Sequence, residues 1–346
     1  MKAPTPRGPV SSAVLSTLEL SPNDPDADAA AERLSAATSV ALQQDGDLLE
    51  DGDLQLGLFL LFELHYTGIE GASDLWEWDR RILESRRHVE DALESVLRRS
   101  VDVPELPAPE TEAVAAALFE LTAPQPGPSL SHEVAVHATD EQLHEFLIHR
   151  SIYTLKEADP HSWAIPRLSG RAKAALVEVQ SDEYGGGRPS RMHSALFAQT
   201  MRGLGLDDSY GHYVDAVPAI TLASLNTMSL FGLNRRLRGA ICGHLAAFEM
   251  TSSLPNRMYG DGFRRLGYGT DVTWYFDEHV EADSVHEQIA GRDLAGGLAE
   301  QEPELLPDIM FGAAACLYVD GLVADHVRLS WNAGRSSLRE PVPTAV

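Results

Sequence analysis

The chain has 346 residues, 44% of them hydrophobic, which is enough to build a sizeable core in one large domain or two ordinary ones. Its 27 basic residues stand against 52 acidic ones, and the net charge of −25 argues against nucleic-acid and anionic-membrane partners, which attract basic patches. Two isolated cysteines, no apolar leader at the N-terminus and no run of roughly 18 apolar residues predict a cytoplasmic chain without a membrane span.

The hydrophobic pattern predicts an all-α fold. Residues 1–25 are rich in proline and serine, and we expect them to be mobile. Beyond them the hydrophobic periodicity is helical nearly throughout, strand-like alternation is absent and β-branched residues are sparse. In chain order, the predicted helices span about 27–43, 54–66, 74–99, 110–121, 140–158, 170–184, 191–203, 218–251, 271–292 and 304–331.

Local signals mark several boundaries of these helices. Thr139 and Gln142 have the spacing of a capping box, and Asp159-Pro160 is expected to end the helix that they begin. The three glycines at 185–187 are expected to break the chain between two shorter helices.

The stretch 101–131, rich in proline and glutamate, divides the chain into two expected regions. Residues 26–130 form an N-terminal helical region, to which we assign packing or dimerisation, so a homodimer is an expected partner state. Residues 131–346 form the core. The segment 101–110 is equally explained as a surface loop within one compact body.

The most informative pattern in the chain is a group of three metal-ligand side chains on one predicted helix. His279, Asp283 and His286 lie four and three residues apart, so they project from one face of a helix. Tyr275 and Ala290 share that stripe, which indicates that the face points inward. Two imidazoles and a carboxylate suit iron, manganese or zinc.

Four further acidic or imidazole side chains interrupt apolar helix faces upstream, at Glu157, Glu183, His193 and Glu249. Taken singly, each acid is better explained by a place near the edge of its face or by pairing with a basic neighbour such as Lys173 or Arg238. Taken together, several unpaired buried carboxylates would be costly in a dry core. Two divalent cations would balance the four carboxylates, including that of Asp283. A donor set without thiolate favours iron or manganese over zinc or copper.

These residues resemble the heme-oxygenase-like diiron oxidases and oxygenases, a helical superfamily that binds two irons and no heme. The resemblance covers about 140–331. It rests on the segments 155–163, 176–186, 192–193 and 243–249 and on the helix with His279, Asp283 and His286. The ligand spacings, 26, 10, 56 and 30 residues from Glu157 to His279, are similar to those of the N-oxygenase branch, which carries an additional carboxylate ligand.

The resemblance implies a heme-oxygenase-like bundle over 131–346 that uses two Fe ions (Fe2+/Fe3+) with O2 as cosubstrate and an external electron donor. The expected substrate is a small amine or amino acid whose amine or guanidine nitrogen is oxygenated in a specialised-metabolite pathway. Tyr184 and Tyr275 are candidate catalytic side chains beside the ligands. The candidate cations for a substrate carboxylate are Arg264, Arg265, Lys173 and Arg235. We expect one iron to be retained weakly.

Three alternatives remain open from the sequence. The same fold also suits oxidative C–C cleavage or desaturation of an amino or fatty acid. A ferritin-like carboxylate bundle would use Glu-x-x-His motifs, and Glu141 with His144 fits that spacing, but this reading leaves His279 and His193 unused. A non-catalytic iron-binding helical protein would share the same pocket. A zinc hydrolase is disfavoured because the motif lacks a glutamate base, and heme because the core is crowded with acids.

Overall fold

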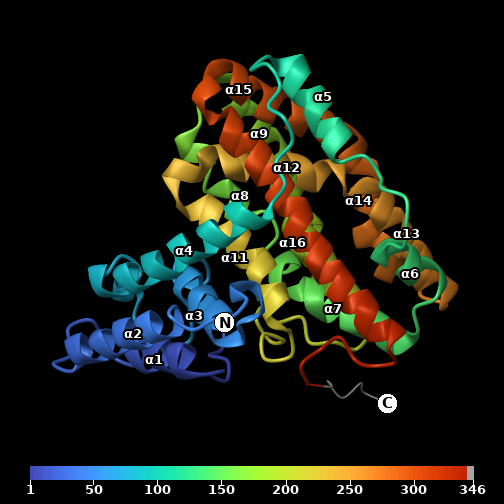
Figure 1. Cartoon of the computed structure of the whole chain (residues 1–346). Coiled ribbons are helices and arrows are strands. Elements are labelled where there is room, and N and C mark those ends of the chain that lie inside the picture. Colours follow the sequence, from blue (N-terminus) through green and yellow to red (C-terminus); the bar gives the residue numbers. More distant parts are fainter. Residues whose placement is uncertain (341–346) are drawn as a thin grey trace.

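A computed structural model describes residues 1–340 of the chain, except for the side chains of residues 281–284 (Figure 1). The described residues form helices and no strands, which confirms the all-α prediction. The α-helices are α1 (Pro9–Leu18), α2 (Ala27–Ala41), α3 (Gly52–Glu63), α4 (Arg80–Ser100), α5 (Thr111–Leu121), α6 (Leu130–Val136), α7 (Asp140–Thr154), α8 (Asp159–Ser162), α9 (Gly170–Glu183), α10 (His193–Gly203), α11 (Ala219–Leu233), α12 (Arg238–Met250), α13 (Ser253–Arg265), α14 (Thr270–Gln288), α15 (Gly297–Gln301) and α16 (Leu306–Asn332).

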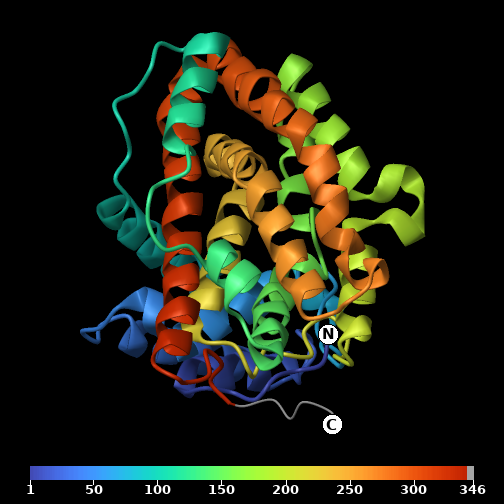
Figure 2. The ribbon, with the colours of Figure 1, turned by 90° about the vertical axis from the view of Figure 1, so that its right-hand side faces the viewer.

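Helix α12 is the centre of the bundle. It packs against α11, α14, α16 and the π-helical segment η7 (Ile289–Gly296) that continues α14. Figure 1 shows α16 running from the end near α15 towards α7, and Figure 2 shows α16 and α14 on opposite sides of the bundle. The helices that carry the predicted ligands therefore surround a common interior.

The N-terminal segment, for which we expected a mobile tail, contains the helix α1. Val10, Val14 and Leu18 recur at helical spacing and are buried on one face of α1. The carboxylate of Asp53 on α3 accepts hydrogen bonds from the backbone N–H groups of Val10 and Ser11 at 2.8 and 2.7 Å. The proline- and serine-rich composition concealed an apolar stripe long enough to hold this helix against α3.

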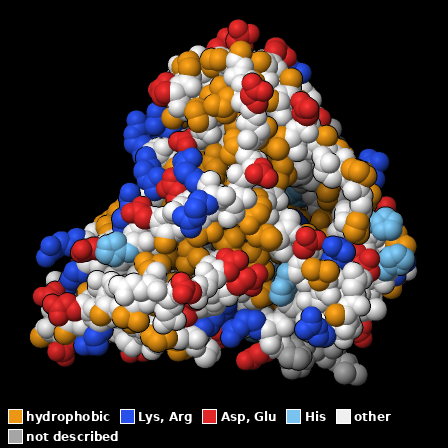
Figure 3. Space-filling model, in the orientation of Figure 1, with side chains coloured by type: hydrophobic (Ala, Val, Ile, Leu, Met, Phe, Trp, Pro, Cys, Tyr) orange, Lys and Arg blue, Asp and Glu red, His pale blue; other side chains and the backbone are white. Residues whose placement is uncertain are grey.

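The N-terminal helices share one hydrophobic core with the rest of the described chain. A buried ion pair joins Glu63 at the end of α3 to Lys156, next to the predicted ligand Glu157. The Tyr210 hydroxyl donates to Glu63 at 2.7 Å. Figure 3 shows hydrophobic side chains in the notch between the N-terminal helices and the upper bundle. The division into two regions and the homodimer stay predictions.

Two predicted helices end earlier than expected. The helix expected over 140–158 begins at the predicted capping box, where the Thr139 side chain accepts from the Gln142 backbone and Gln142 accepts in return. It ends at Thr154, and Asp159-Pro160 begins the short helix α8 instead of ending α7, after Ala158 with φ 78°. The helix expected over 218–251 is interrupted at Asn234 and forms α11 and α12.

Helix α16 fits against α12 without side chains between the backbones. A Cβ atom at Gly243 would overlap the Ile309 carbonyl, and one at Gly312 would overlap the Ala240 carbonyl. Residues 303–332, which contain α16, are the one helix in the described chain long and apolar enough to cross a membrane, but 56% of the apolar window is buried inside the protein. Such burial is typical of a core helix in a soluble protein. A cytoplasmic location stays a prediction.

Candidate metal centre

Six of the seven predicted metal ligands are described, and all six are buried at the centre of the bundle. Their exposed fractions lie between 2% and 8%. The seventh, Asp283, has a side chain outside the described residues. The six come from five places in the chain: Glu157 from the turn between α7 and α8, Glu183 from the end of α9, His193 from the start of α10, Glu249 from α12, and His279 and His286 from α14.

A first cluster consists of Glu157, His193 and His279. One ligand atom from each lies within 4.8 Å of the others. The Tyr275 carbonyl accepts a hydrogen bond from Nδ1 of His279 at 2.8 Å, so the second ring nitrogen, Nε2, faces Glu157 Oε1 at 3.7 Å. A backbone carbonyl that fixes the tautomer and orientation of an imidazole is the support that metal-ligating histidines use.

A second cluster consists of Glu183, Glu249 and His286, again with one ligand atom each within 4.8 Å. The His286 ring bridges two carboxylates, because Nε2 lies 3.0 Å from Asp182 Oδ2 and Nδ1 lies 3.5 Å from Glu249 Oε2. Burial opposes a charge on His286, but Glu249 and Asp182 outweigh it and raise the pKa of His286 to about 9. The sequence reading missed Asp182, whose own side chain is exposed.

The two clusters meet at Glu183 and His193. Glu183 Oε2 lies 3.0 Å from Nδ1 of His193, and the rings of His193 and His279 lie 4.4 Å apart. Burial opposes charge on both members of this pair, but their mutual attraction lowers the pKa of Glu183 and raises that of His193. The contact lacks hydrogen-bond geometry, since His193 Nδ1 is buried without a hydrogen-bond partner among the described residues.

The chemistry of these six side chains fits a metal centre. In the described part of the chain, histidines are the only ion-pair partners of the three carboxylates. The other explanation, pairing with Lys173 or Arg238, does not apply: Arg238 pairs with Glu302. Among the described side chains, Glu157 Oε2 and His286 Nδ1 are also buried without hydrogen-bond partners, which is costly unless a cation satisfies them.

A small cavity lies among these donors. Its volume is about 10 Å³, close to the space that one water-sized sphere needs. Carboxylates of both clusters, Glu157, Glu183 and Glu249, line it together with His279. Burial raises the pKa of Glu249, although His286 acts against it. Oxygen and imidazole donors without thiolate suit iron.

The two predicted catalytic tyrosines lie in different surroundings. The Tyr275 hydroxyl donates to Glu157 Oε1 at 2.9 Å and so touches a candidate ligand. The Tyr184 hydroxyl donates to Asp159 at 2.7 Å and lies beside Ser162, outside both cavities. Only Tyr275 is therefore placed to influence the clusters directly. Tyr153, which sequence reasoning did not single out as functional, lines the small cavity and a larger one beside it.

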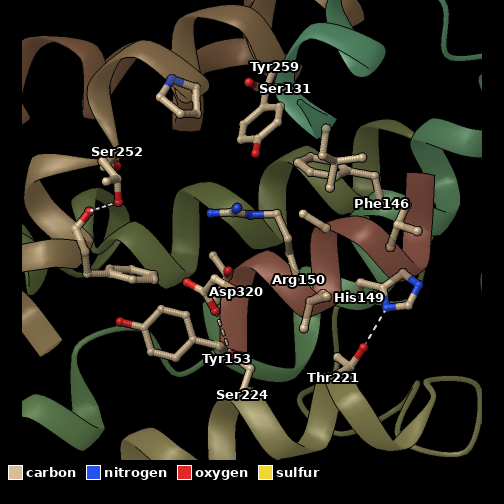
Figure 4. A pocket seen from close by; sticks show the side chains of 18 of the residues that line it. Ser131, Phe146, His149, Arg150, Tyr153, Thr221, Ser224, Ser252, Tyr259 and Asp320 are labelled. Atoms are coloured by element: carbon tan, nitrogen blue, oxygen red, sulfur yellow. Dashed lines mark hydrogen bonds between the residues drawn. The ribbon is translucent and has the colours of Figure 1, made fainter. Parts of the chain in front are cut away.

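The larger cavity has a volume of about 400 Å³ and adjoins the first cluster, because Glu157 and His279 form part of its wall. Most of its wall is apolar, and the charged side chains Arg150 and Asp320 project into it (Figure 4). A largely apolar cavity with a few polar groups is typical of a small-molecule site. Arg150 lies four residues after Phe146 and three before Tyr153, so the three share one helix face. This spacing is a sequence signal that could have identified Arg150 as a residue of the cavity wall.

None of the four predicted substrate cations lines this cavity. Arg264 pairs with Asp261 and Asp277 at the surface, and Arg265 donates to backbone carbonyls of the segment 134–138. Lys173 borders a shallow depression on α9, and Arg235 is exposed. A role for them in substrate binding stays a prediction without support from the cavity.

The ferritin-like alternative finds no support in this geometry. Glu141 is exposed in the first turn of α7. His144 bonds through its two ring nitrogens to the backbone carbonyls of Asp140 and Leu204, and neither residue belongs to the two clusters.

Comparison with known proteins gives the class of the chain. Residues 144–321 match the model of a family described as iron-containing redox enzymes. The match covers just over half of the chain and includes all the predicted ligands. The chain therefore belongs to this family, and it is an oxidoreductase with the heme-oxygenase-like all-α fold.

A nitrosourea synthase from Streptomyces achromogenes subsp. streptozoticus is 29% identical to the chain over 160 residues. The match covers 46% of this chain and only 34% of that enzyme, so the chain corresponds to about a third of its length. Two crystal structures of a CADD-like protein of unknown function from Nostoc punctiforme are also similar. Their TM-scores are 0.49 and 0.45, and their sequence identities are 15% and 16%. The two matches cover 65% and 69% of this chain and 96% and 97% of the other chains.

Proposed function

We propose that the chain is a non-heme diiron oxygenase that uses O2 to oxygenate an amine or guanidine nitrogen of a small amino-acid-derived substrate in a specialised-metabolite pathway. The observation that carries the proposal is the pair of three-residue clusters joined by Glu183 and His193, which offers donors for two neighbouring ions. The likeness to a nitrosourea synthase supports the choice of nitrogen, because a nitrosourea carries oxidised nitrogen.

Two irons, when bound, would supply the redox chemistry that activates dioxygen. One oxygen atom would enter an N–H bond of the substrate. The other would leave as water, which takes two electrons and two protons from an external donor. In this proposal Glu157, Glu183, His193, Glu249, His279 and His286 would hold the ions, and Asp283 of α14 would join them.

The protein's own contribution is orientation and the exclusion of water. Tyr275 holds one oxygen of Glu157 by a hydrogen bond, which leaves the second oxygen for the first cluster. Phe248 and Tyr153 border both the large and the small cavity. A substrate in the large cavity therefore approaches the first cluster past an aromatic wall that keeps bulk water away.

The proposal is tested by anaerobic loading with Fe(II), counting of bound iron, and rapid mixing with O2 and a panel of amino acids. We expect two irons per chain, an oxygen-dependent visible absorbance change, and a hydroxylamine, nitroso or nitro product by mass spectrometry. Carbon loss or desaturation in the product would favour the alternative chemistry. Iron binding without any absorbance change would favour a non-catalytic iron protein.

Two ligand variants test the site assignment. Glu183→Ala and His279→Ala should each lose at least one iron and the absorbance change. Glu178→Ala, an exposed position on the same helix as Glu183, is the matched control and should bind iron as the parent does. Two irons and normal reactivity in either ligand variant would overturn the assignment. Full retention of both irons after purification without added iron would contradict the expected weak binding at one position.

A further inference from the structure

The large cavity contains an arginine, Arg150, that forms no ion pair with a carboxylate among the described side chains. In the described part of the chain, no acidic side chain lies within ion-pair distance of the Arg150 guanidinium, and Nε of Arg150 is buried without a hydrogen-bond partner. Its electrostatic partners are the hydroxyls of Tyr275 and Tyr259 and, at longer range, Glu157. Since arginine keeps its charge in proteins, this is a cation held inside an apolar cavity.

Neighbouring side chains hold Arg150 in position. Its guanidinium lies 5.6 Å from the ring centres of both Phe146 and Tyr259. Figure 4 shows the guanidinium reaching toward the middle of the cavity between these aromatic side chains and Asp320. A guanidinium fixed in this way loses little further freedom when it binds an anion, so the site is preorganised for a carboxylate.

A carboxylate of opposite charge projects into the same cavity from α16. Ser224 donates a hydrogen bond to Asp320 Oδ1 at 2.8 Å, and the Cys316 thiol lies 3.9 Å from Oδ2. Burial raises the pKa of Asp320, although the charge of Arg150 acts against it. Asp320 and Arg150 are near enough to influence one another but are not an ion pair. A half-buried carboxylate and a half-buried guanidinium that face one cavity without forming an ion pair leave room for a dipolar ligand.

We propose that Arg150 and Asp320 bind the carboxylate and the ammonium group of a free α-amino acid. Such a head group carries its two charges on one carbon, and each charge would offset the burial of the side chain that it meets. The cavity volume of about 400 Å³ suits a ligand of this size. A fatty acid would pair with Arg150 but offer no positive charge to Asp320, so the same observation disfavours fatty-acid substrates.

This assignment also decides which part of the ligand reacts, and in that respect it rests on the proposed function. When Asp320 engages the α-ammonium, the α-nitrogen is committed to the head-group site. The side chain of the amino acid then extends along the apolar wall towards Glu157 and His279. The nitrogen to be oxygenated is therefore one carried by the side chain.

The test is calorimetric binding to the anaerobic Fe(II)-loaded protein, which does not depend on turnover. The probes are the standard amino acids and ornithine, with three truncated compounds: agmatine and cadaverine, which lack the carboxylate of arginine and lysine, and 6-aminohexanoic acid, which lacks the α-ammonium of lysine. We expect at least one amino acid with a nitrogen in its side chain to bind. Its truncated counterparts should bind at least about tenfold more weakly. If no free amino acid binds the parent protein, the assignment is wrong.

Variants separate the two halves of the head-group site. Arg150→Gln should weaken binding of the amino acid about tenfold to a hundredfold, with little effect on its decarboxylated counterpart. Asp320→Asn should weaken the amino acid in the same range and spare 6-aminohexanoic acid. Equal losses of affinity for the full and the truncated probes would show that these side chains do not bind the head group. Arg150→Lys keeps the charge and should recover part of the affinity.

Further variants control for folding and for the rival position. Circular dichroism melts establish that each variant is folded. Arg87→Gln removes an exposed arginine that pairs with Asp91 on α4, and should bind as the parent does. If Arg264→Gln, and not Arg150→Gln, lowers affinity, the carboxylate is bound outside the cavity. A protein that binds amino acids as described but does not react with O2 would refute the proposed function and leave the head-group assignment standing.

Discussion

Glu183 and His193 lie at facing ends of two helices, and their side chains touch at 3.0 Å between Oε2 and Nδ1. Helix α9 ends at the first residue and α10 begins at the second. Between them, Gly185, Gly186 and Gly187 adopt φ values of 68°, 59° and 77°, which turn the chain back on itself. The connection between the two metal clusters therefore depends on a glycine turn that contributes no ligand.

Gly185→Ala should damage this connection more than Gly186→Ala. Alanine at either position has a strained left-handed conformation, at about 1–2 kcal/mol. At Gly185 the new Cβ would also lie 2.6 Å from backbone atoms of Arg191 and Met192, whereas at Gly186 nothing lies within 4 Å. We expect lower stability in denaturant and fewer bound irons for Gly185→Ala, with Gly186→Ala as the matched control. Equal iron content in the two variants would refute this role of the turn.

Asp182 is expected to support the second cluster although it binds no metal itself. Its carboxylate holds His286 through Nε2 at 3.0 Å and so leaves Nδ1 directed at Glu249. Loss of such an outer partner lowers metal affinity about 10- to 100-fold. Asp182→Ala should therefore weaken one of two iron-binding steps in an anaerobic titration. Asp182→Asn keeps an acceptor oxygen and should have the smaller effect. The idea fails if both variants bind iron like the parent.

The buried pair of Lys156 and Glu63 should be a major contact between the N-terminal helices and the core. Both side chains are almost completely buried. Lys156→Met leaves the carboxylate buried without its cation, which should lower the free energy of unfolding by about 3–5 kcal/mol. The double variant Glu63→Gln/Lys156→Met removes both charges and should recover part of that loss in urea denaturation. A double variant less stable than the single one would contradict this account.

Acid should destabilise the metal-free protein through histidines that are buried in their neutral form. Burial lowers the pKa of His149 to about 3, and its ring contacts Thr221 and Ser337. Because this pKa lies below the ordinary value of 6.5, protons bind the unfolded chain first as the pH falls. Stability should thus decrease below about pH 6.5, by about 1.4 kcal/mol per pH unit for this residue, until about pH 3.

The matched variant for this prediction is His149→Gln, which keeps hydrogen-bonding groups but does not titrate. In urea denaturation it should lose less stability than the parent between about pH 6 and about pH 4. An unchanged slope would show that other groups dominate. His244, whose pKa burial lowers to about 3, contributes in the same direction and remains in the variant.

Much of the convergence of the candidate ligands could be predicted from the sequence because a helix repeats its faces. Glu183, Glu249 and the histidines of α14 each continue an apolar stripe, so the periodicity that predicts burial also predicts convergence. Glu157 continues the apolar stripe of α7 in the sequence, but in the structure it lies in the turn beyond Thr154, after the helix has ended. Beyond Thr154 the chain turns, and Ala158 has a left-handed conformation. The sequence has no glycine at this position to indicate the turn.

The large cavity was not predicted, although weak signals were present. Arg150 lies on the stripe of Phe146, Tyr153 and Glu157, at spacings of four, three and four residues. Asp320 is the single charged residue in the stretch 309–324. Each is explained equally by an ordinary surface ion pair. Only the tertiary structure shows that the two charges share one cavity without pairing, because that depends on how α7 and α16 pack.

The contact between α12 and α16 joins the proposed metal centre to the proposed head-group site. Glu249 is carried by the first helix and Asp320 by the second, and the glycines at 243 and 312 allow the two backbones to touch. The separation between the head-group site and the ions is then set by a rigid backbone contact and not by flexible side chains. A fixed separation of this kind would select the length of the substrate side chain. An amino acid whose side chain is one methylene too short or too long would bind, yet present the wrong atom for oxidation.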